Sequence, residues 1–374
     1  MLYSRTRRAL TGSAIALFAA SAVPATAQED VTISIGMAAV ITSLDPHEDS
    51  NSPNNATSRH IYDSLINRGG SAENKPQLAA SWEVLDSTHW HFTLREDVKF
   101  HDGSTFDSED VVASLIRARD KESKAFASYT RHIAKVTADG PYGVTVETTV
   151  ADPMILNSLS RIRIISSDYA DASLADFENG KAAIGTGPFK FSSYTPGDRI
   201  ELDRNDNYFA GPSEWSHVTI RMVPDNGGRL ASLLAGDLDL IEALPAEGVD
   251  RVENSDGMHI IRGQSTRLVY LGMDVGRDQT PFVTAKDGSP LVSNPFKDAR
   301  VRKALLMAIN RDAIVDRIMR KNGTVADQFV AKGFFGNSEE VEKVTYDPEA
   351  ARKLLADAGY PDGFGMTIHG PSGR

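Results

Sequence analysis

The sequence predicts an α/β fold. Residues 217–223 and 238–244 are apolar segments of strand length, and the amphipathic segment 227–236 between them has the length of a short helix. A connection of that length favours two parallel strands joined by a right-handed crossover. The 374 residues, of which 41% are hydrophobic and 24% charged, are enough for two or three compact units of a soluble globular protein.

The N-terminal residues predict a cleaved secretory signal. Three arginines within the first eight residues precede a short apolar run, 9–23, and a small-x-small motif ends at Ala27. The run is too short to span a bilayer, so no membrane insertion is expected. We therefore expect the mature chain to start at Gln28. The Arg7-Arg8 pair leaves twin-arginine export as an alternative to the general secretory route.

Composition narrows the compartment and the partners. The chain has no cysteine, which excludes disulfides, thiol chemistry and a lipid-bearing cysteine after the signal. Export without a lipid anchor predicts a freely diffusing periplasmic protein. The net charge of −11 becomes −14 when residues 1–27 are removed, because they contain three arginines and no acidic residue. Such an acidic chain disfavours binding to nucleic acid or to an anionic membrane surface.

The N-terminal third is expected to alternate strands and helices. Residues 31–41 predict a buried strand, 42–58 a polar, asparagine-rich loop, and 60–66 a short helix. The stretch 89–94 predicts a half-buried strand, because apolar residues occupy its even positions while His89 and His91 lie at odd positions, facing outward.

A hairpin and a helix are expected to follow that strand. Residues 98–100 predict a second strand that ends at Asp102-Gly103. Asp107 or Ser108 can cap the next helix. Its apolar residues lie along one stripe: Val111, Val112, Leu115 and Ala118.

The second half of the chain carries clear turn and cap signals. Pro196-Gly197 suits a type II turn between a strand with Phe189 and Phe191 and a return strand with Ile200 and Leu202. Helices are then expected over 298–309 with Asp298 as its cap, from Asn310 to Asn322-Gly323, and from Asp347-Pro348 to Gly359.

Residues 365–370 predict a last strand only four residues before the sequence stops. A strand needs a sheet to join, so the C-terminal part is expected to be incomplete.

Five segments, in order, are similar to one known family. They are "KPQLAASWEVLD" with "WHFTLREDVKFHDGSTFDSEDV", "GTGPFKF" with "LDRNDNYF", "GRLASLLAGDLDLIEALP", "DARVRKALLMAINRDAIVDRIM" and "YDPEAARKLLADAGYPDGF". Together they resemble the family 5 (peptide/nickel type) extracellular solute-binding proteins of bacterial ABC importers, and the resemblance covers the chain from about Val31 to Arg374.

The resemblance implies a periplasmic-binding-protein-like clamshell, in which two lobes, one with an extra domain, close over a solute. By analogy, domain I comprises 29–65 and 185–265, domain II comprises 66–184, and domain III comprises 266–374 and is incomplete. Family members are longer, which agrees with a truncated C-terminus.

Catalytic and metal-binding interpretations are weaker. His89 and His91, with His101-Asp102, could ligate a metal, but their alternation on a strand favours surface positions. No G-x-S-x-G or H-E-x-x-H motif occurs, and "GTGPFK" departs from a phosphate-binding loop because it ends in lysine. We expect no catalytic residue, no metal site and no cofactor.

Three places are candidates for contact with a solute. Ser43, Leu44 and Asp45 follow the first strand, where open sheets present loops to a cleft, although Asp45-Pro46 could be only a turn. Tyr129 resembles a tyrosine that some peptide binders offer to the ligand, and a buried structural tyrosine is the alternative. Arg374 resembles an arginine that binds a ligand carboxylate in some dipeptide binders.

The expected function is that of the periplasmic solute-binding component of an ABC transporter. The expected partners are a short peptide or similar small solute and an inner-membrane ABC permease, and the protein is expected to be a monomer and not an enzyme. Carriage of a nickel chelate, an oligosaccharide or an opine-like solute is the first alternative. A periplasmic enzyme or chaperone and a truncated, inactive remnant are the others.

Overall fold

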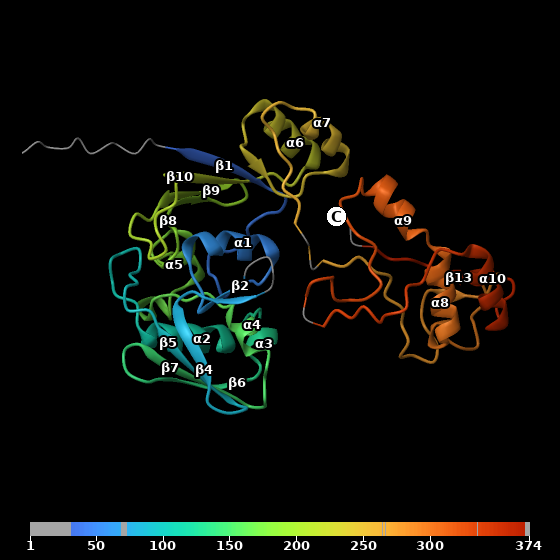
Figure 1. Ribbon diagram of the computed structural model, residues 1–374, viewed down its shortest axis with the longest axis horizontal. Coiled ribbons are helices and arrows are strands. Elements are labelled where there is room, and N and C mark those ends of the chain that lie inside the picture. The colour runs from blue at the N-terminus through green and yellow to red at the C-terminus, as the bar shows by residue number, and fades with distance from the viewer. Residues whose placement is uncertain (1–30, 69–72, 264, 266, 335, 371–374) are drawn as a thin grey trace, which may run out of the picture.

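The computed structural model describes residues 31–370 except 69–72, 264, 266 and 335. Figure 1 shows a larger body, which contains β1 to β11, and a smaller C-terminal body. The chain passes from one to the other through residues 259–276, whose described residues form neither helix nor strand. An ion pair of 3.0 Å between Arg320 and Asp250 also connects the two bodies.

A five-stranded mixed sheet forms the first half of the larger body. Its order is β11-β1-β10-β9-β8, and β1 pairs in parallel with both β10 and β11. The predicted parallel arrangement of the strands before and after the connecting helix is therefore confirmed, and β1 lies between these two strands, β10 and β11. The elements are β1 (Thr32–Met37), β8 (Phe189–Thr195), β9 (Arg199–Arg204), β10 (His217–Met222), α6 (Asn226–Ala235) and β11 (Leu240–Ile241).

A four-stranded antiparallel sheet of order β4-β5-β7-β6 forms the other half. Helix α2 packs on it and begins with the predicted Asp107 cap, which forms a capping box with Asp110. The elements are β4 (Ala79–Val84), β5 (His89–Leu94), α2 (Ser108–Asp120), α3 (Ala127–Thr130), β6 (Ile133–Ala138), β7 (Gly143–Thr148) and α4 (Ile155–Leu159), with a two-stranded ribbon of β2 (Ile66–Arg68) and β3 (Asn74–Pro76) beside them.

Each sheet has its own hydrophobic core. Phe92 and Leu94 of β5 are buried with Phe106 and Leu115 in the core of the four-stranded sheet, as the alternation predicts. The core of the five-stranded sheet contains the apolar residues of its inner strands and the end of α1 (Ser52–Ile61), together with short helices η1 (Ser167–Tyr169) and α5 (Leu174–Glu178).

The regular elements of the smaller body are mostly helices, joined by long irregular segments. Helices α8 (Ala299–Ala308) and α10 (Pro348–Asp357) pack on each other and begin at the predicted caps Asp298 and Asp347. The remaining elements of this half of the chain are η2 (Ala246–Gly248), α7 (Val249–Glu253), β12 (Val283–Thr284), η3 (Pro295–Lys297), α9 (Arg311–Ala313), η4 (Ile314–Ile318) and β13 (Gly365–Met366). Strand β13 pairs with β12 over two residues.

Several predicted elements were wrong. The helix expected over 60–66 instead begins at Ser52 and ends at Ile61, within the stretch expected to be a loop, because Asn51 caps it and tertiary contacts bury four of its residues. Residues 98–100 do not form a strand: only Lys99 bridges to Thr105, since β4 and β7 occupy both edges of β5.

Other elements are shorter than expected. The strands expected over 31–41 and 238–244 are reduced to β1 and β11, and the helix expected after Asn310 is reduced to α9 and the π-helical turn η4.

Two glycines allow the chain to return from the four-stranded to the five-stranded sheet. Gly187 N–H donates to the Ile61 carbonyl over 2.9 Å, so this segment lies directly against the end of α1. A Cβ at Gly185 would lie 2.0 Å from the Ile61 carbonyl oxygen, and a Cβ at Gly187 would lie 2.6 Å from the Ile61 carbonyl carbon. The "GTG" motif thus serves close backbone packing between the two sheets.

We predict that Gly185→Ala destabilises the larger body by at least about 2 kcal/mol, because the new methyl group meets backbone that cannot move independently. Equilibrium unfolding in urea measures the change. Gly263→Ala is the matched control, since a Cβ there has no neighbour within 4 Å. Equal stability of the two variants would contradict the packing role.

Candidate functional site

The loop after β1 forms a turn around Asp45. The Asp45 N–H donates to Ser43 Oγ over 3.0 Å, and the His47 N–H donates to Asp45 Oδ1 over 2.9 Å. The loop then ends at Asn51, which caps α1. A turn at Asp45-Pro46, which was the alternative to solute contact, is therefore present, and it leaves the Asp45 carboxylate directed at another part of the molecule.

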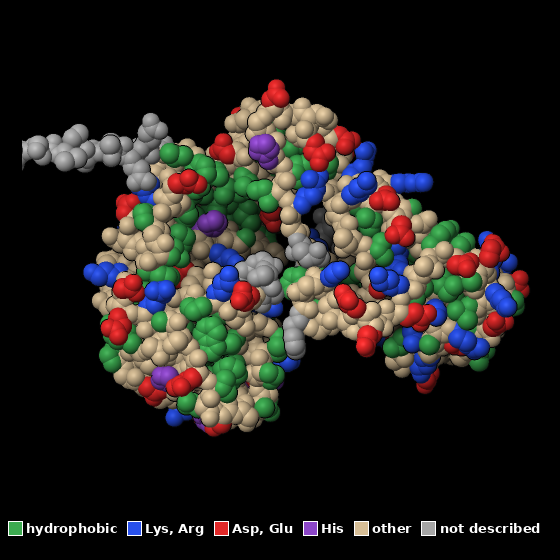
Figure 2. Space-filling model, viewed as in Figure 1, with side chains coloured by type: hydrophobic (Ala, Val, Ile, Leu, Met, Phe, Trp, Pro, Cys, Tyr) green, Lys and Arg blue, Asp and Glu red, His purple; other side chains and the backbone are tan. Residues whose placement is uncertain are grey.

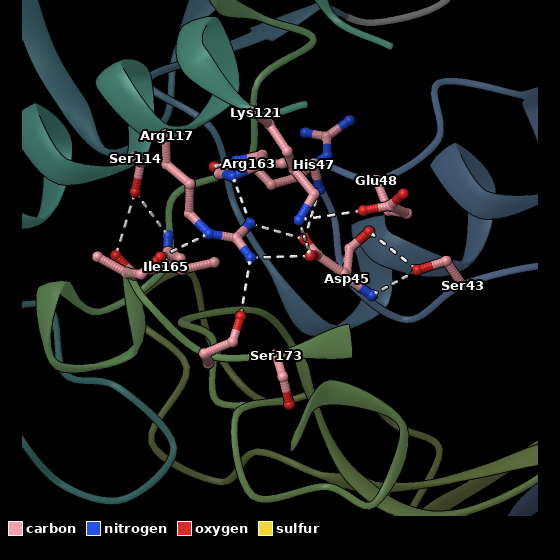
Figure 3. Close-up of polar contacts among 12 residues, drawn as sticks. Ser43, Asp45, His47, Glu48, Ser114, Arg117, Lys121, Arg163, Ile165 and Ser173 are labelled. Carbon is pink, nitrogen blue, oxygen red and sulfur yellow. Dashed lines mark hydrogen bonds and ion pairs between the residues drawn. The ribbon is translucent and has the colours of Figure 1, made fainter. Parts of the chain in front are cut away.

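That carboxylate binds two cations of α2. Arg117 donates from Nη1 to Oδ1 over 2.7 Å and from Nη2 to Oδ2 over 2.8 Å, and Lys121 Nζ lies 2.8 Å from Oδ2. Figure 3 shows both side chains pointing from α2 toward Asp45. Arg117 and Lys121 are four residues apart and so share one face of the helix.

Asp45 is fully enclosed, with only 1% of its surface exposed. Burial raises its pKa, but hydrogen bonds and charge from Arg117, followed by Lys121, have the larger combined effect, so its pKa lies well below the usual range. The carboxylate is therefore ionised at neutral pH. Arg117 adds a further hydrogen bond from Nε to the Ala170 carbonyl over 2.8 Å, which fixes the guanidinium plane.

His47 completes this cluster as a neutral side chain. Its Nε2 lies 2.8 Å from the Arg163 carbonyl oxygen, and its Nδ1 lies 3.1 Å from Arg117 Nη1. The pair of contacts requires Nε2 to carry the proton and Nδ1 to accept. Burial, followed by the charge of Arg117, lowers the pKa of His47 to about 4.

The Asp45 cluster, defined as Asp45, His47, Arg117 and Lys121, therefore holds the loop after β1 against α2. Ser43 and Leu44 are buried beside it, around a small space of about 10 Å³ that matches one water molecule. Because both Asp45 carboxylate oxygens are engaged, the side chain acts in this structure as a positioning group. Contact of Ser43, Leu44 or Asp45 with a solute stays a prediction.

A second set of contacts shapes the edge at which the parallel strands β1, β10 and β11 end. The buried Arg229 donates to four main-chain carbonyls in the loops after β10 and β11. One of them belongs to Ala243, which has a left-handed φ of 53°. Arg229 therefore holds both loops in place, and Val40, in the loop after β1, is 42% exposed.

The other sequence candidates are placed differently. Tyr129 lies on α3 and packs on Phe126, with 6.0 Å between ring centroids, and Phe126 contacts the His47 ring at the same separation. The structure thus brings Tyr129 to within one aromatic ring of the Asp45 cluster. Arg374, Ala27 and Gln28 lie outside the described residues.

The three histidines of the 89–101 stretch have protein partners. His89 Nδ1 lies 3.0 Å from Asp86 Oδ1, and His91 Nδ1 lies 3.2 Å from Thr145 Oγ1. His101 instead turns inward, with Nε2 2.9 Å from the Gly187 carbonyl and Nδ1 3.3 Å from the Gly185 N–H. Burial, with a smaller effect of Lys190, lowers the pKa of His101 to about 4.

Sequence reasoning missed Arg117, Lys121, His47 and Arg229. The available signal was the four-residue spacing of Arg117 and Lys121 on the polar side of a predicted helix. That spacing does not reveal that the partner of Arg117 lies 72 residues away in the sequence. Arg229 lies within a predicted helix beside Gly227 and Gly228, where nothing local shows that an arginine will be buried.

We predict that Asp45→Asn lowers the free energy of unfolding by about 3 kcal/mol, because it leaves Arg117, whose side chain is only 10% exposed, without a counter-charge, while Lys121 keeps its ion pair with Glu48. Urea unfolding followed by fluorescence measures this loss. Glu349→Gln, which removes one partner of a solvent-exposed ion pair with Arg352, should change little. A loss no greater in Asp45→Asn than in this control would contradict the role of the cluster.

Stability should rise with pH between about 4 and 6.5 in part because of His101. Its folded-state pKa is about 4 and its unfolded value 6.5, so the unfolded chain binds the extra proton within this window. His101→Gln should therefore flatten the dependence by up to about 1.4 kcal/mol per pH unit. Asp63 and Asp110, whose raised pKa values act in the opposite direction, are present in both proteins. Identical slopes in urea unfolding at several pH values would contradict the assignment.

Comparison with known proteins identifies the family. Residues 73–372 match the family described as bacterial extracellular solute-binding proteins, family 5 Middle. Heme-binding protein A of Haemophilus influenzae is 29% identical over 339 residues, covering 83% of this chain and 58% of that protein. Glutathione-binding protein GsiB of Escherichia coli is 29% identical over 363 residues, covering 96% of this chain and 66% of that protein. The chain thus spans less than two thirds of the length of these relatives.

Solved structures show the same fold. NikZ from Campylobacter jejuni, in complex with Ni(L-His), matches with a TM-score of 0.71 at 22% identity, covering 87% of this chain and 63% of that one. The oligopeptide-binding protein AppA from Bacillus subtilis, in complex with a nonapeptide, matches with a TM-score of 0.67 at 24% identity, covering 87% and 64%.

These matches confirm the predicted periplasmic-binding-protein-like α/β fold. No helix among those that the structure describes is long and apolar enough to cross a bilayer. The chain belongs to family 5 of the bacterial extracellular solute-binding proteins.

Proposed function

We propose that this chain is the solute-binding component of an ABC importer and that its solute is a short peptide. The signal that ends at Ala27 would direct it to the periplasm, where it would act as a monomer without a lipid anchor and deliver solute to an inner-membrane permease. The observation that carries the proposal is the family match over most of the chain, together with an open strand edge of the kind that holds ligands in α/β proteins.

The binding surface in this proposal is the edge where β1, β10 and β11 end. Val40 is 42% exposed there although it is apolar, and Arg229 holds the neighbouring loops from beneath. The Asp45 cluster fixes the turn that follows Val40 in the loop after β1. A preorganised surface reduces the entropy lost on binding, which favours affinity for a small solute.

Closure would bring the C-terminal body over this edge. The proposed domains are 29–65 with 185–265, 66–184, and 266–374, and the irregular segment between the two bodies in Figure 1 would supply the hinge. Figure 2 shows the surface hollowed between the larger body and the C-terminal body. A solute that contacts both bodies would shift the open–closed equilibrium toward the closed form.

Peptide is favoured over other solutes because main-chain groups of the loops at the strand ends, together with bridging waters, can bind a peptide backbone without selecting its sequence. Several relatives support this choice, including AppA and a Helicobacter pylori binding protein in complex with the peptide STSA. A nickel chelate or an opine is the second candidate, since NikZ is in complex with Ni(L-His) and AgaA with agropinic acid. Neither mechanism requires covalent chemistry, and the curated relatives are binding proteins.

Isothermal titration calorimetry with tri-alanine, tetra-alanine, Ni(L-His) and agropinic acid tests the proposal. We predict saturable binding of at least one peptide, and a loss of affinity of about tenfold in Val40→Asp, because a charge would replace an apolar contact at the edge. Val150→Asp is the matched control, since Val150 is similarly exposed at 49% but lies beside the four-stranded sheet.

If the protein binds Ni(L-His) or agropinic acid but neither peptide, the proposed solute changes from a peptide to a nickel chelate or an opine. Equal affinity of the two valine variants would contradict the placement of the site, and absence of any saturable binding would contradict the proposed function.

A further inference from the structure

A small space lies between the turn at Asp45 and helix α1. It measures about 10 Å³, and its walls include Ser43 and Asp45 from the loop after β1 and Thr57 and Tyr62 from α1 and its C-terminal cap. All four residues are buried, each with at most 5% of its surface exposed. A space of this size has room for one water molecule and for no larger ligand.

Tyr62 brings an unpaired hydroxyl to this space. Its hydroxyl oxygen is buried and has no hydrogen-bond partner in the part of the chain that the structure describes. The Cδ1 edge of its ring lies near Gly185, where an added Cβ would be 2.7 Å from it. Burial, followed by the charge of Asp45, raises the pKa of Tyr62, while Arg117 acts in the opposite direction, so the hydroxyl lies at the end of the ring near the Asp45 cluster. A buried hydroxyl without a hydrogen bond is costly.

Two further hydroxyls beside the same space form only long contacts as donors among the described residues. Ser43 Oγ accepts from the Asp45 N–H over 3.0 Å, but its own proton is directed at the Asp45 carbonyl oxygen at 3.5 Å (Figure 3). Thr57 Oγ1 donates to the Met37 sulfur over 3.7 Å. Hydrogen bonds between oxygens usually measure about 2.7–2.8 Å. Three buried hydroxyls around one space therefore keep capacity for a shared partner.

We propose that this space is a binding site for one water molecule, held by the hydroxyls of Tyr62, Ser43 and Thr57. Water both donates and accepts, so it can pair with all three hydroxyls at once. The bound water joins α1 to the loop after β1, which Arg117 holds from α2. The loop that carries Val40 is thus fixed from two sides, and this role does not depend on the identity of the solute.

Water suits the site better than a cation does. The Asp45 carboxylate already binds Arg117 and Lys121 with both oxygens. Asp49, a second acidic residue beside the space, accepts hydrogen bonds from Thr42 and Asn51. The partners left over are neutral hydroxyls, which match a neutral molecule that is both donor and acceptor.

Urea unfolding of the full chain without solute tests the site through the sign of one change. Tyr62→Phe removes only the hydroxyl, and it should raise the unfolding equilibrium constant about fivefold, because the water loses a partner. Tyr346→Phe, at a residue that is 47% exposed, is the matched control and should change the constant less than about twofold. A hydroxyl without any ligand predicts the opposite sign, because its removal ends an unfavourable burial. A Tyr62→Phe variant as stable as the wild type, or more stable, would overturn the site.

A double-mutant cycle with Thr57→Val tests whether the ligand is shared. The combined variant should lose less stability than the sum of the two single losses, because both hydroxyls bind the same water. Additive losses would contradict a shared ligand. A crystal structure of the full chain should show an ordered water within hydrogen-bond distance of Tyr62 Oη, and a direct bond from Tyr62 Oη to a protein atom would contradict the proposal. Stabilisation by potassium chloride beyond that by tetramethylammonium chloride, lost in Tyr62→Phe, would replace the water with a cation.

Discussion

The bidentate ion pair between Asp45 and Arg117 is the interaction on which the arrangement of the larger body depends. It joins the loop after the first strand of one sheet to the helix that covers the other sheet. Lys121 and His47 enclose the same carboxylate, so water cannot replace either partner at low cost. The contact therefore fixes how the two sheets meet, and with it the position of the strand edge where we place the solute.

Three arginines show how differently this chain treats a buried cation. Arg117 has a carboxylate, and Arg229 has a set of main-chain carbonyls that stabilise two loops. Arg163 has only a serine hydroxyl and leaves one donor unsatisfied. The first two are explained by the folded chain alone. Arg163 lies near the buried Asp63, whose negative charge opposes the effect of Arg59 and Arg161 on its pKa.

Local signals predicted much of the fold, and long-range contacts account for what they missed. Alternation at 89–94 predicted β5, and the aspartates at 107, 298 and 347 marked three helix starts, because these features act within a few residues. Helix α1 escaped prediction because its residues are mostly polar and its burial comes from distant segments. The pairing of Asp45 with α2 was equally invisible from the sequence, although the loop itself was a candidate.

The most direct test of the account is native mass spectrometry of the chain purified from a bacterial periplasm. We predict a folded monomer whose mass starts at Gln28 and which carries a small, releasable solute. A folded chain that is empty in every preparation, and that takes up none of the solutes added to it, would contradict the central claim that this strand edge binds a solute.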